Sequence, residues 1–307
     1  VGRVDLFNMP AFNNDDIELT RTYLNKLHDF KIKRYTTPDR GVVLDQLDWT
    51  GRPLAETGWR TMGPMVGANN IRVLSYGNNF LTVATTGYTW STTAGGGRLD
   101  KTGYTDLNGG NVESFVVTPL NSVFNTSIGS YFGDFADQNN FLRAFLATGR
   151  ALTNAWAGLP RWIFHHFAFS DTIGYSTKVT QNGTSLYTTT ELYTYDGANT
   201  NVHLNLMGDP SLRLKYVETP SNLIVTQSGP NLLFGWAPAA DDKVLGYHIY
   251  RIYSDGSPHA RITGSPVAGS TATVAIGGAV SATVGTQYMV RAIRLETNRS
   301  GSYYNAS

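Results

Sequence analysis

The sequence predicts two domains, an α/β domain with a mainly parallel sheet and flanking helices, followed by an all-β sandwich. The length of 307 residues fits two domains of about 100–200 residues each. Residues 1–217 alternate helical patterns with short apolar runs, which is typical of a parallel sheet covered by helices. Residues 218–307 carry short alternating segments separated by turn residues, which is typical of a β-sandwich.

The composition excludes several classes of function. Lys and Arg number 24 against 23 Asp and Glu, so there is no basic excess to neutralise a phosphate backbone, and we expect no nucleic-acid partner. No apolar run approaches the ~20 residues that span a bilayer. The chain has no cysteine, which excludes disulfides, thiolate metal sites and a cysteine nucleophile. Because 41% of residues are hydrophobic, we expect buried cores.

The first elements are an expected strand and an expected helix. Val1–Leu6 reads as an inner strand, so one of its edges should face an upstream segment of the polypeptide or another protein chain. An apolar pattern at helical spacing follows the capping residues Asn13–Asp16 and predicts a helix over Asp15–Tyr35.

Short apolar runs then predict buried strands, interrupted by helices. Gly41–Asp45, Asn70–Leu74 and Phe80–Thr85 have the continuous character of strands that are buried on both faces. Helices are expected near Trp49 and over Asn140–Ala151.

The C-terminal domain resembles a fibronectin type III domain, an immunoglobulin-like sandwich. Alternating strand patterns occur over residues 220–226, 231–236, 246–251, 271–275 and 287–292, and Pro238 follows Trp236. The resemblance implies that Trp236 fills the core between the sheets and that Tyr288 lies on the tyrosine-corner strand. Such modules usually serve as spacers or binding platforms.

Residues 1–217 resemble the catalytic domain of gingipain-type cysteine peptidases. The matching segments are Val1–Val4, Asn125–Tyr131 and Asn205–Leu214, the last of which contains Gly-Asp-Pro-Ser-Leu. The resemblance implies a caspase-like fold that lacks its N-terminal part here. Within the last motif, Pro210 holds Asp209 out of the helical region, so we expect an Asx-type turn and a structural role for Asp209.

The residues expected at the peptidase centre cannot form the family's Cys–His dyad. Tyr88 stands where the resemblance places the histidine, and Ser130 and Tyr131 fill the stretch of the nucleophile. A tyrosine with a pKa of about 10 is no general base near neutral pH. We therefore expect no catalytic residue. Tyr88, Trp90 and Tyr131 would instead offer an aromatic surface for a peptide or a glycan.

A secreted hydrolase with a non-cysteine site is the alternative. It would use Ser130 together with His165 or His166. Adjacent histidines on a helix point about 100° apart, so this pair is expected to pack structurally rather than to act together.

The remaining candidate is a calcium site. Asp134, Asp137 and Asn139 place oxygen ligands at near-alternate positions of one loop, which suits Ca²⁺. The competing interpretation is a helix N-cap before Phe141. No other cofactor is expected.

Together these features predict a catalytically inactive, peptidase-like scaffold. We expect it to belong to an extracellular or cell-surface bacterial protein, with a structural or binding role in a larger assembly. Its expected partners are other protein chains or upstream segments of the same polypeptide, and a glycan is an alternative ligand.

Overall fold

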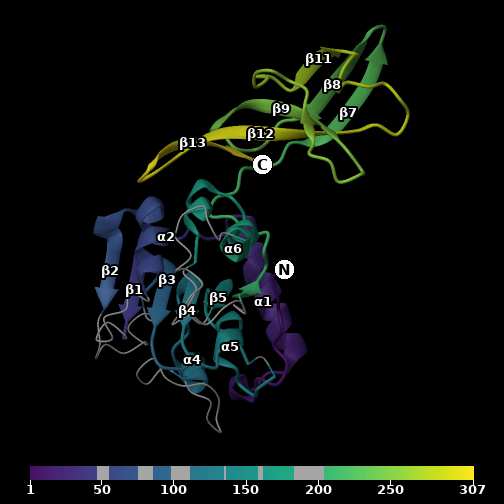
Figure 1. The fold of residues 1–307 in the computed structure, drawn as a ribbon. Coiled ribbons are helices and arrows are strands. Elements are labelled where there is room, and N and C mark those ends of the chain that lie inside the picture. The colour runs from purple at the N-terminus through teal and green to yellow at the C-terminus, as the bar shows by residue number, and fades with distance from the viewer. Residues whose placement is uncertain (47–54, 75–85, 98–110, 135, 158–161, 183–203) are drawn as a thin grey trace. The chain divides into compact units, whose positions relative to one another are not determined.

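The computed structural model describes residues 1–46, 55–74, 86–97, 111–134, 136–157, 162–182 and 204–307 (Figure 1). The chain forms two compact units, which are described separately below. Unit 1 contains residues 1–214 with 298–300, and unit 2 contains residues 215–297 with 301–307. The boundary thus lies slightly before the predicted one at 217/218. Within the described residues, no helix is long and apolar enough to cross a membrane.

Unit 1 is built on one six-stranded mixed sheet. Its strand order is β2-β1-β3-β4-β5-β6, and only β6 is antiparallel to its neighbour. Figure 1 shows β2 to β5 side by side in this order. The strands are β1 (Gly41–Asp45), β2 (Ile71–Leu74), β3 (Tyr88–Ala94), β4 (Ser122–Ile128), β5 (Thr153–Ala157) and β6 (Leu204–Gly208).

Three inner strands of this sheet, β1, β3 and β4, are fully buried, as the apolar pattern of β1 predicted. Every residue of β1, β3 and β4 is buried. The prediction that residues 70–74 form a strand buried on both faces was wrong, because β2 is an edge strand whose Arg72 and Val73 are exposed. The predicted strand Phe80–Thr85 lies outside the described residues.

The predicted first helix is confirmed as α1 (Asp16–Lys31). The Asp15 side chain caps it by accepting a hydrogen bond from the Glu18 amide at 2.8 Å, which satisfies one of the free N–H groups of the first turn. Leu19, Tyr23, Leu27 and Phe30 form its buried face at the spacing of one helical face.

The other helices of unit 1 are shorter. The Asn140 side chain caps α5 by accepting from the Arg143 amide, which confirms the predicted helix start. The apolar run that contains His165 and His166 forms only a 3₁₀ turn, and the helix start near Trp49 lies outside the described residues. The helices are η1 (Pro10–Phe12), α2 (Glu56–Val66), η3 (Ala68–Asn70), α4 (Val112–Val117), α5 (Phe141–Ala147), η4 (His165–Phe169) and α6 (Ile173–Asn182).

The prediction that Val1–Leu6 is an inner strand was wrong. Only Arg3 makes a bridge, and this bridge joins Met207 on β6, the edge strand of the sheet. The Arg3 amide donates to Leu206 O at 3.0 Å, and the Arg3 carbonyl accepts from the Gly208 amide at 2.7 Å. A single bridge leaves this segment outside the six-stranded sheet, beside β6. The expected pairing with an upstream segment or another chain stays a prediction.

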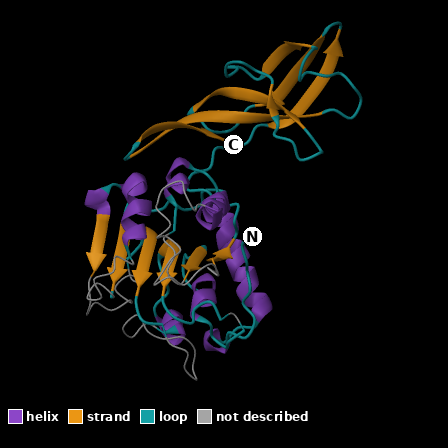
Figure 2. Cartoon of the chain, in the orientation of Figure 1, coloured by secondary structure: helices purple, strands orange, loops and turns teal. Residues whose placement is uncertain are grey.

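Unit 2 consists of two antiparallel sheets that share one core (Figure 2). The strand orders are β10-β9-β12-β13 and β11-β8-β7. Trp236 is buried in the shared core, as predicted, with its ring centroid 5.4 Å from that of Tyr247. The strands are β7 (Ser221–Ser228), β8 (Asn231–Ala237), β9 (Val244–Ile252), β10 (Ala260–Arg261), β11 (Thr271–Ala275), β12 (Gln287–Asn298) and β13 (Gly301–Ala306).

Tyr288 makes the two hydrogen bonds of a tyrosine corner near the start of β12. Its hydroxyl donates to Ser281 O at 2.7 Å and accepts from the Ser281 amide at 2.8 Å. The ring also packs on Phe234 at a centroid distance of 5.2 Å. The position of Tyr288 that the sequence predicted is thus confirmed.

Candidate functional site

The candidate site lies where β3 and β4 end. Ala94 and Ile128, the last residues of these parallel strands, are register partners. The Gly95 amide donates to Ile128 O at 3.0 Å, so the pairing continues one residue beyond β3. Because parallel strands present their following loops at one edge, this edge of an α/β sheet commonly holds the functional site.

Gly97 lies directly against the backbone of Ser130. A Cβ atom at position 97 would be 1.9 Å from Ser130 O and 2.5 Å from Ser130 N. Only glycine allows such a close approach between two backbones. We call this contact the Gly97–Ser130 junction. The run Gly95–Gly97, directly after a buried strand, was the available sequence signal for a close backbone contact.

Ser130 itself is exposed, and no hydrogen bond joins its hydroxyl to any other described residue. The next residue, Tyr131, has a left-handed backbone conformation with φ of 66° and is 54% exposed. A serine hydroxyl needs a hydrogen-bonded base to become a strong nucleophile. Within the described part of the chain, the structure shows no such base at Ser130.

The loop after β4 is anchored by two aromatic side chains, the half-buried Trp156 and the buried Phe132. Trp156 Nε1 donates to Gly129 O at 2.7 Å, and the Trp156 ring leaves no room for a side chain at Gly133. Phe132 is fully buried, with its ring 4.8 Å from that of Phe141. These contacts fix the backbone on both sides of Ser130 and Tyr131.

A buried polar row crosses the strands beneath this edge, and the sequence did not reveal it. Ser91 Oγ donates to Asn125 Oδ1 at 2.6 Å, and Asn125 Nδ2 donates to Thr153 O at 3.0 Å. Closer to the carboxyl end of β4, Ser127 Oγ donates to Asn154 Oδ1 at 2.9 Å. Since buried polar groups must be paired, these bonds tie β3, β4 and β5 in one register.

Tyr88 and Trp90 do not form a binding surface, so this part of the prediction was wrong. Tyr88 is the first residue of β3 and is only 2% exposed, whereas the prediction placed it after the strand. Trp90 is fully buried, and its ring packs against those of Phe164 and Phe167 at 4.8 and 5.7 Å. Of the three aromatic residues proposed for binding, Tyr131 alone is exposed.

The two histidines lie together, contrary to the expectation that they diverge. The His165 and His166 rings stack with centroids 4.2 Å apart. Burial lowers the pKa of His166 below its usual range, although Asp171 raises it. Burial, His166 and the Arg60 guanidinium lower the pKa of His165.

The same histidines are remote from Ser130. Phe167, at the centre of their 3₁₀ turn, packs on Phe124 with ring centroids 4.7 Å apart. Phe124 is the third residue of β4, and Ser130 follows six residues later, or about 20 Å along an extended chain. The structure therefore does not bring Ser130 together with His165 or His166.

The residues of the expected calcium site are engaged in hydrogen bonds within the protein. Asn139 Oδ1 accepts from the Ala11 amide at 3.1 Å, and the Asp137 carbonyl accepts from Arg143 at 2.6 Å. Asp134 is exposed. The oxygen that Asn139 would supply to calcium is thus already used. In the described residues, no group of three His, Cys, Asp or Glu side chains converges on one point.

Asp209 forms the predicted Asx-type turn. Its Oδ1 accepts from the Ser211 amide at 2.8 Å, and its Oδ2 lies 2.6 Å from Lys31 Nζ. Burial raises the pKa of this carboxyl, but the hydrogen bonds from Lys31 and Ser211 outweigh burial and hold the pKa below its usual value. The predicted structural role agrees with these contacts.

Unit 1 is a mixed α/β unit, and its candidate site is the Gly97–Ser130 junction at the ends of β3 and β4. Unit 2 consists of two antiparallel β-sheets. The chain matches no protein-family model and no curated protein. Among solved structures, it is similar to the crystal structure of a Fn3-like protein from Clostridium thermocellum, with 17% sequence identity and a TM-score of 0.20. The match covers 29% of this chain and 90% of that one.

Proposed function

We propose that this chain is a catalytically silent scaffold of the gingipain type, followed by a fibronectin type III module. The observation that carries the proposal is the Gly97–Ser130 junction. At the strand ends where the resemblance expects an imidazole beside a nucleophile, a glycine packs against backbone, and the exposed Ser130 has no described base. A scaffold whose reacting groups are absent can still present its strand-end loops to a partner.

Further features support the two fold assignments. A mainly parallel sheet with one antiparallel edge strand is compatible with the caspase-like fold that the resemblance implies. The Asp209 turn lies within the Gly-Asp-Pro-Ser-Leu motif on which the resemblance rests. In unit 2, the buried Trp236 and the bonds between Tyr288 and Ser281 support the fibronectin type III assignment.

The proposed setting is an extracellular or cell-surface assembly in which the partner is another protein segment. Support comes from the low content of charged residues, 15%, and from a module of a kind that often serves as a binding platform. At the site, Tyr131 is held outward on an anchored loop, and an exposed tyrosine suits contact with a peptide.

The proposal is tested by fluorophosphonate labelling of the full chain, with peptide mass spectrometry to locate any adduct. We expect no adduct at Ser130, while an active serine hydrolase in the same reaction is labelled. The proposal is overturned if Ser130 is labelled stoichiometrically and one histidine substitution abolishes that labelling. The variants are His165→Gln, His166→Gln and His203→Gln, the last included because His203 lies outside the described residues. Ser130→Ala controls for adducts elsewhere.

A further inference from the structure

A segment near the N-terminus lies against the loop that carries Ser130 and Tyr131. We call residues 5–11 the clamp segment, and we call the loop, whose described residues are 129–134 and 136–140, the site loop. A hydrogen bond from the Ala11 amide to the Asn139 side chain joins them across 128 positions of the sequence. The tertiary structure therefore brings the clamp segment to the candidate site of unit 1.

Asn139 joins the two segments through both its main chain and its side chain. Its amide donates to Asn8 O at 3.0 Å, and its Oδ1 accepts from the Ala11 amide at 3.1 Å. Asn139 is buried and has a left-handed φ of 50°, a conformation that asparagine adopts more readily than most residues. The two bonds fix Asn139 in one orientation against the clamp segment.

The Arg143 guanidinium makes a second connection between the segments. Arg143 lies in α5 and is only 1% exposed. Its Nη1 donates to Phe7 O at 2.6 Å and lies 3.4 Å from Asp5 Oδ1. Its Nη2 donates to Asp137 O at 2.6 Å. Because a buried charge without partners is strongly destabilising, Arg143 opposes separation of the clamp segment from the site loop.

The connection extends to Tyr131 through Asn140. Asn140 Oδ1 accepts from the Arg143 amide at 3.1 Å, and Asn140 Nδ2 donates to Phe132 O at 3.0 Å. Phe132 directly follows Tyr131, whose φ is 66°. A bulky residue keeps such a conformation only where the surrounding structure holds it. The bonds from Arg143 through Asn140 to Phe132 supply part of this support.

The clamp segment has little regular structure of its own. Residues 4–9 belong to no helix or strand. Leu6 and Met9 are buried, whereas Phe7 is 69% exposed. A segment held by two buried side chains and a few hydrogen bonds opens at a lower free energy than a central strand does. It can therefore be displaced while the sheet of unit 1 stays folded.

We propose that the clamp segment regulates the partner-binding site of unit 1 by fixing the site loop. While the clamp segment is in place, the site loop holds Tyr131 outward. When the clamp segment is displaced, Asn139 and Arg143 lose their bonds to it, and the site loop loses its fixed conformation. This regulation rests on the proposed function, in which Tyr131 contacts another protein segment. By linkage, a partner that binds the ordered site loop also stabilises the clamp segment.

Hydrogen exchange of the full chain tests this coupling from both sides of the contact. Asp5→Ala removes the carboxylate beside Arg143. Asn139→Gly removes the acceptor of the Ala11 amide, and glycine tolerates the left-handed backbone. We expect each variant to accelerate exchange at least about threefold in both the clamp segment and residues 129–134, because a lost hydrogen bond favours local opening by about this factor or more.

Asp255→Ala is the matched control, because it removes an exposed carboxylate of unit 2. Both segments should keep their wild-type exchange in this variant. Peptides from β1 should exchange as in wild type in every variant, which verifies that unit 1 is folded. If β1 exchanges faster in Asp5→Ala, Asp5→Asn takes its place, because the amide retains an acceptor for the Phe7 amide.

The proposal is overturned if, in either folded variant, the segment across the contact keeps its wild-type exchange rate. That segment is the site loop for Asp5→Ala and the clamp segment for Asn139→Gly. Neither measurement involves the chemistry of Ser130. A reactive Ser130 would therefore overturn the proposed function, whereas uncoupled exchange would overturn the regulation alone.

Discussion

Lys31 Nζ lies 2.6 Å from Asp209 Oδ2, so the last turn of α1 is tied to the turn that follows β6. The two residues are 178 positions apart in the sequence. The Tyr23 hydroxyl reinforces this tie, because it accepts from the Asp209 amide at 2.9 Å and donates to Leu152 O at 3.1 Å. The Gly-Asp-Pro segment therefore joins α1 to the edge of the sheet.

Removal of the Asp209 carboxyl should destabilise unit 1. Asp209→Ala loses the bonds to Lys31 and Ser211, and we expect a loss of about 1–3 kcal/mol in the free energy of unfolding. Asp209→Asn keeps an acceptor for the Ser211 amide and should lose less. Because a two-unit chain need not unfold in one step, hydrogen exchange of peptides from α1 and β6 is the appropriate measurement. Equal protection in wild type and Asp209→Ala would contradict the assignment.

The same carboxyl should make stability depend on acid pH. The pKa of Asp209 is lower in the folded state than the ~3.9 of an unfolded chain, so its stabilising effect is fully present above ~3.9. The effect is lost as the pH falls through the folded-state pKa. The stability difference between wild type and Asp209→Asn should therefore be constant from about pH 5 to 7 and shrink below about pH 4. A difference that stays constant down to about pH 2 would contradict this linkage.

Gly97→Ala should disturb the Gly97–Ser130 junction. The new Cβ would lie 1.9 Å from Ser130 O, so one of the two loops must move. We expect a loss of about 1–3 kcal/mol, measured as faster hydrogen exchange in peptides from β3 and β4. Gly96→Ala is the matched control, because no atom of a described residue lies within 4 Å of a Cβ at that position. If both variants behave like wild type, the two backbones are not in contact.

Lys26 should cause stability to rise with pH. Burial of its ammonium group, which donates to Thr148 O at 3.0 Å, lowers the pKa to about 7. Between about pH 7 and 9.5 the unfolded chain, with a pKa near 10.4, holds the proton that the folded chain has released. The free energy of unfolding should therefore increase with pH in wild type relative to Lys26→Met.

The slope of this dependence is at most about 1.4 kcal/mol per pH unit. Lys178→Met, at an exposed lysine of α6, is the control and should keep the wild-type pH dependence. Parallel stability curves for wild type and Lys26→Met would show that the Lys26 pKa is not lowered.

Tyr288→Phe should loosen the tyrosine corner of unit 2. The substitution keeps the ring against Phe234 and removes both hydrogen bonds to Ser281, at an expected cost of about 1–3 kcal/mol. The direct measurement is amide exchange at Ser281, which should accelerate. Tyr304→Phe, at a residue that is 73% exposed, should leave this exchange rate unaltered. Slow exchange at Ser281 in Tyr288→Phe would refute the role of the hydroxyl.

The local patterns of the sequence were sufficient to predict several elements. The capping residue Asp15 and the helical spacing of the apolar residues after it predict α1. Alternating apolar and polar residues between turns predict the strands of unit 2. Both signals are local, because capping and side-chain periodicity act within a few residues. The Asp209 turn was equally predictable, since a proline restricts the residue before it whatever lies around.

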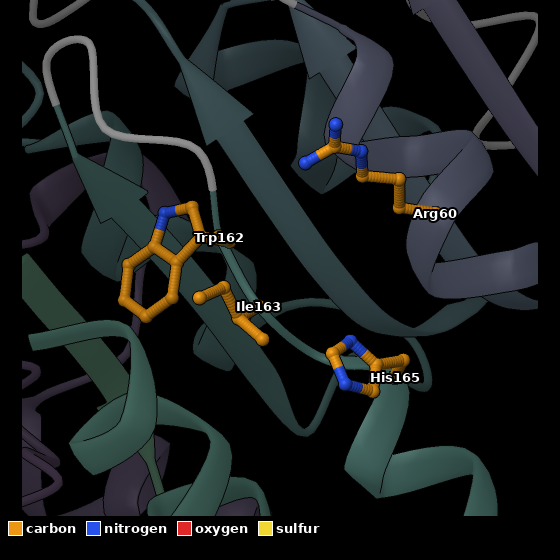
Figure 3. Close-up of a pocket in the computed structure, with 4 residues that line it drawn as sticks. All are labelled: Arg60, Trp162, Ile163 and His165. Carbon is orange, nitrogen blue, oxygen red and sulfur yellow. The ribbon is translucent and has the colours of Figure 1, made fainter. Parts of the chain in front are cut away.

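The candidate site was decided by the tertiary structure. The sequence placed Tyr88 after a predicted strand, but only pairing with β1 and β4 determines where a strand begins. In the structure β3 begins at Tyr88, which lies in the core. The Gly97–Ser130 junction likewise joins two segments of the chain, and so does a pocket lined by Arg60, Trp162, Ile163 and His165 (Figure 3). Such contacts depend on strand register and on how helices pack on the sheet, and no short sequence pattern encodes either.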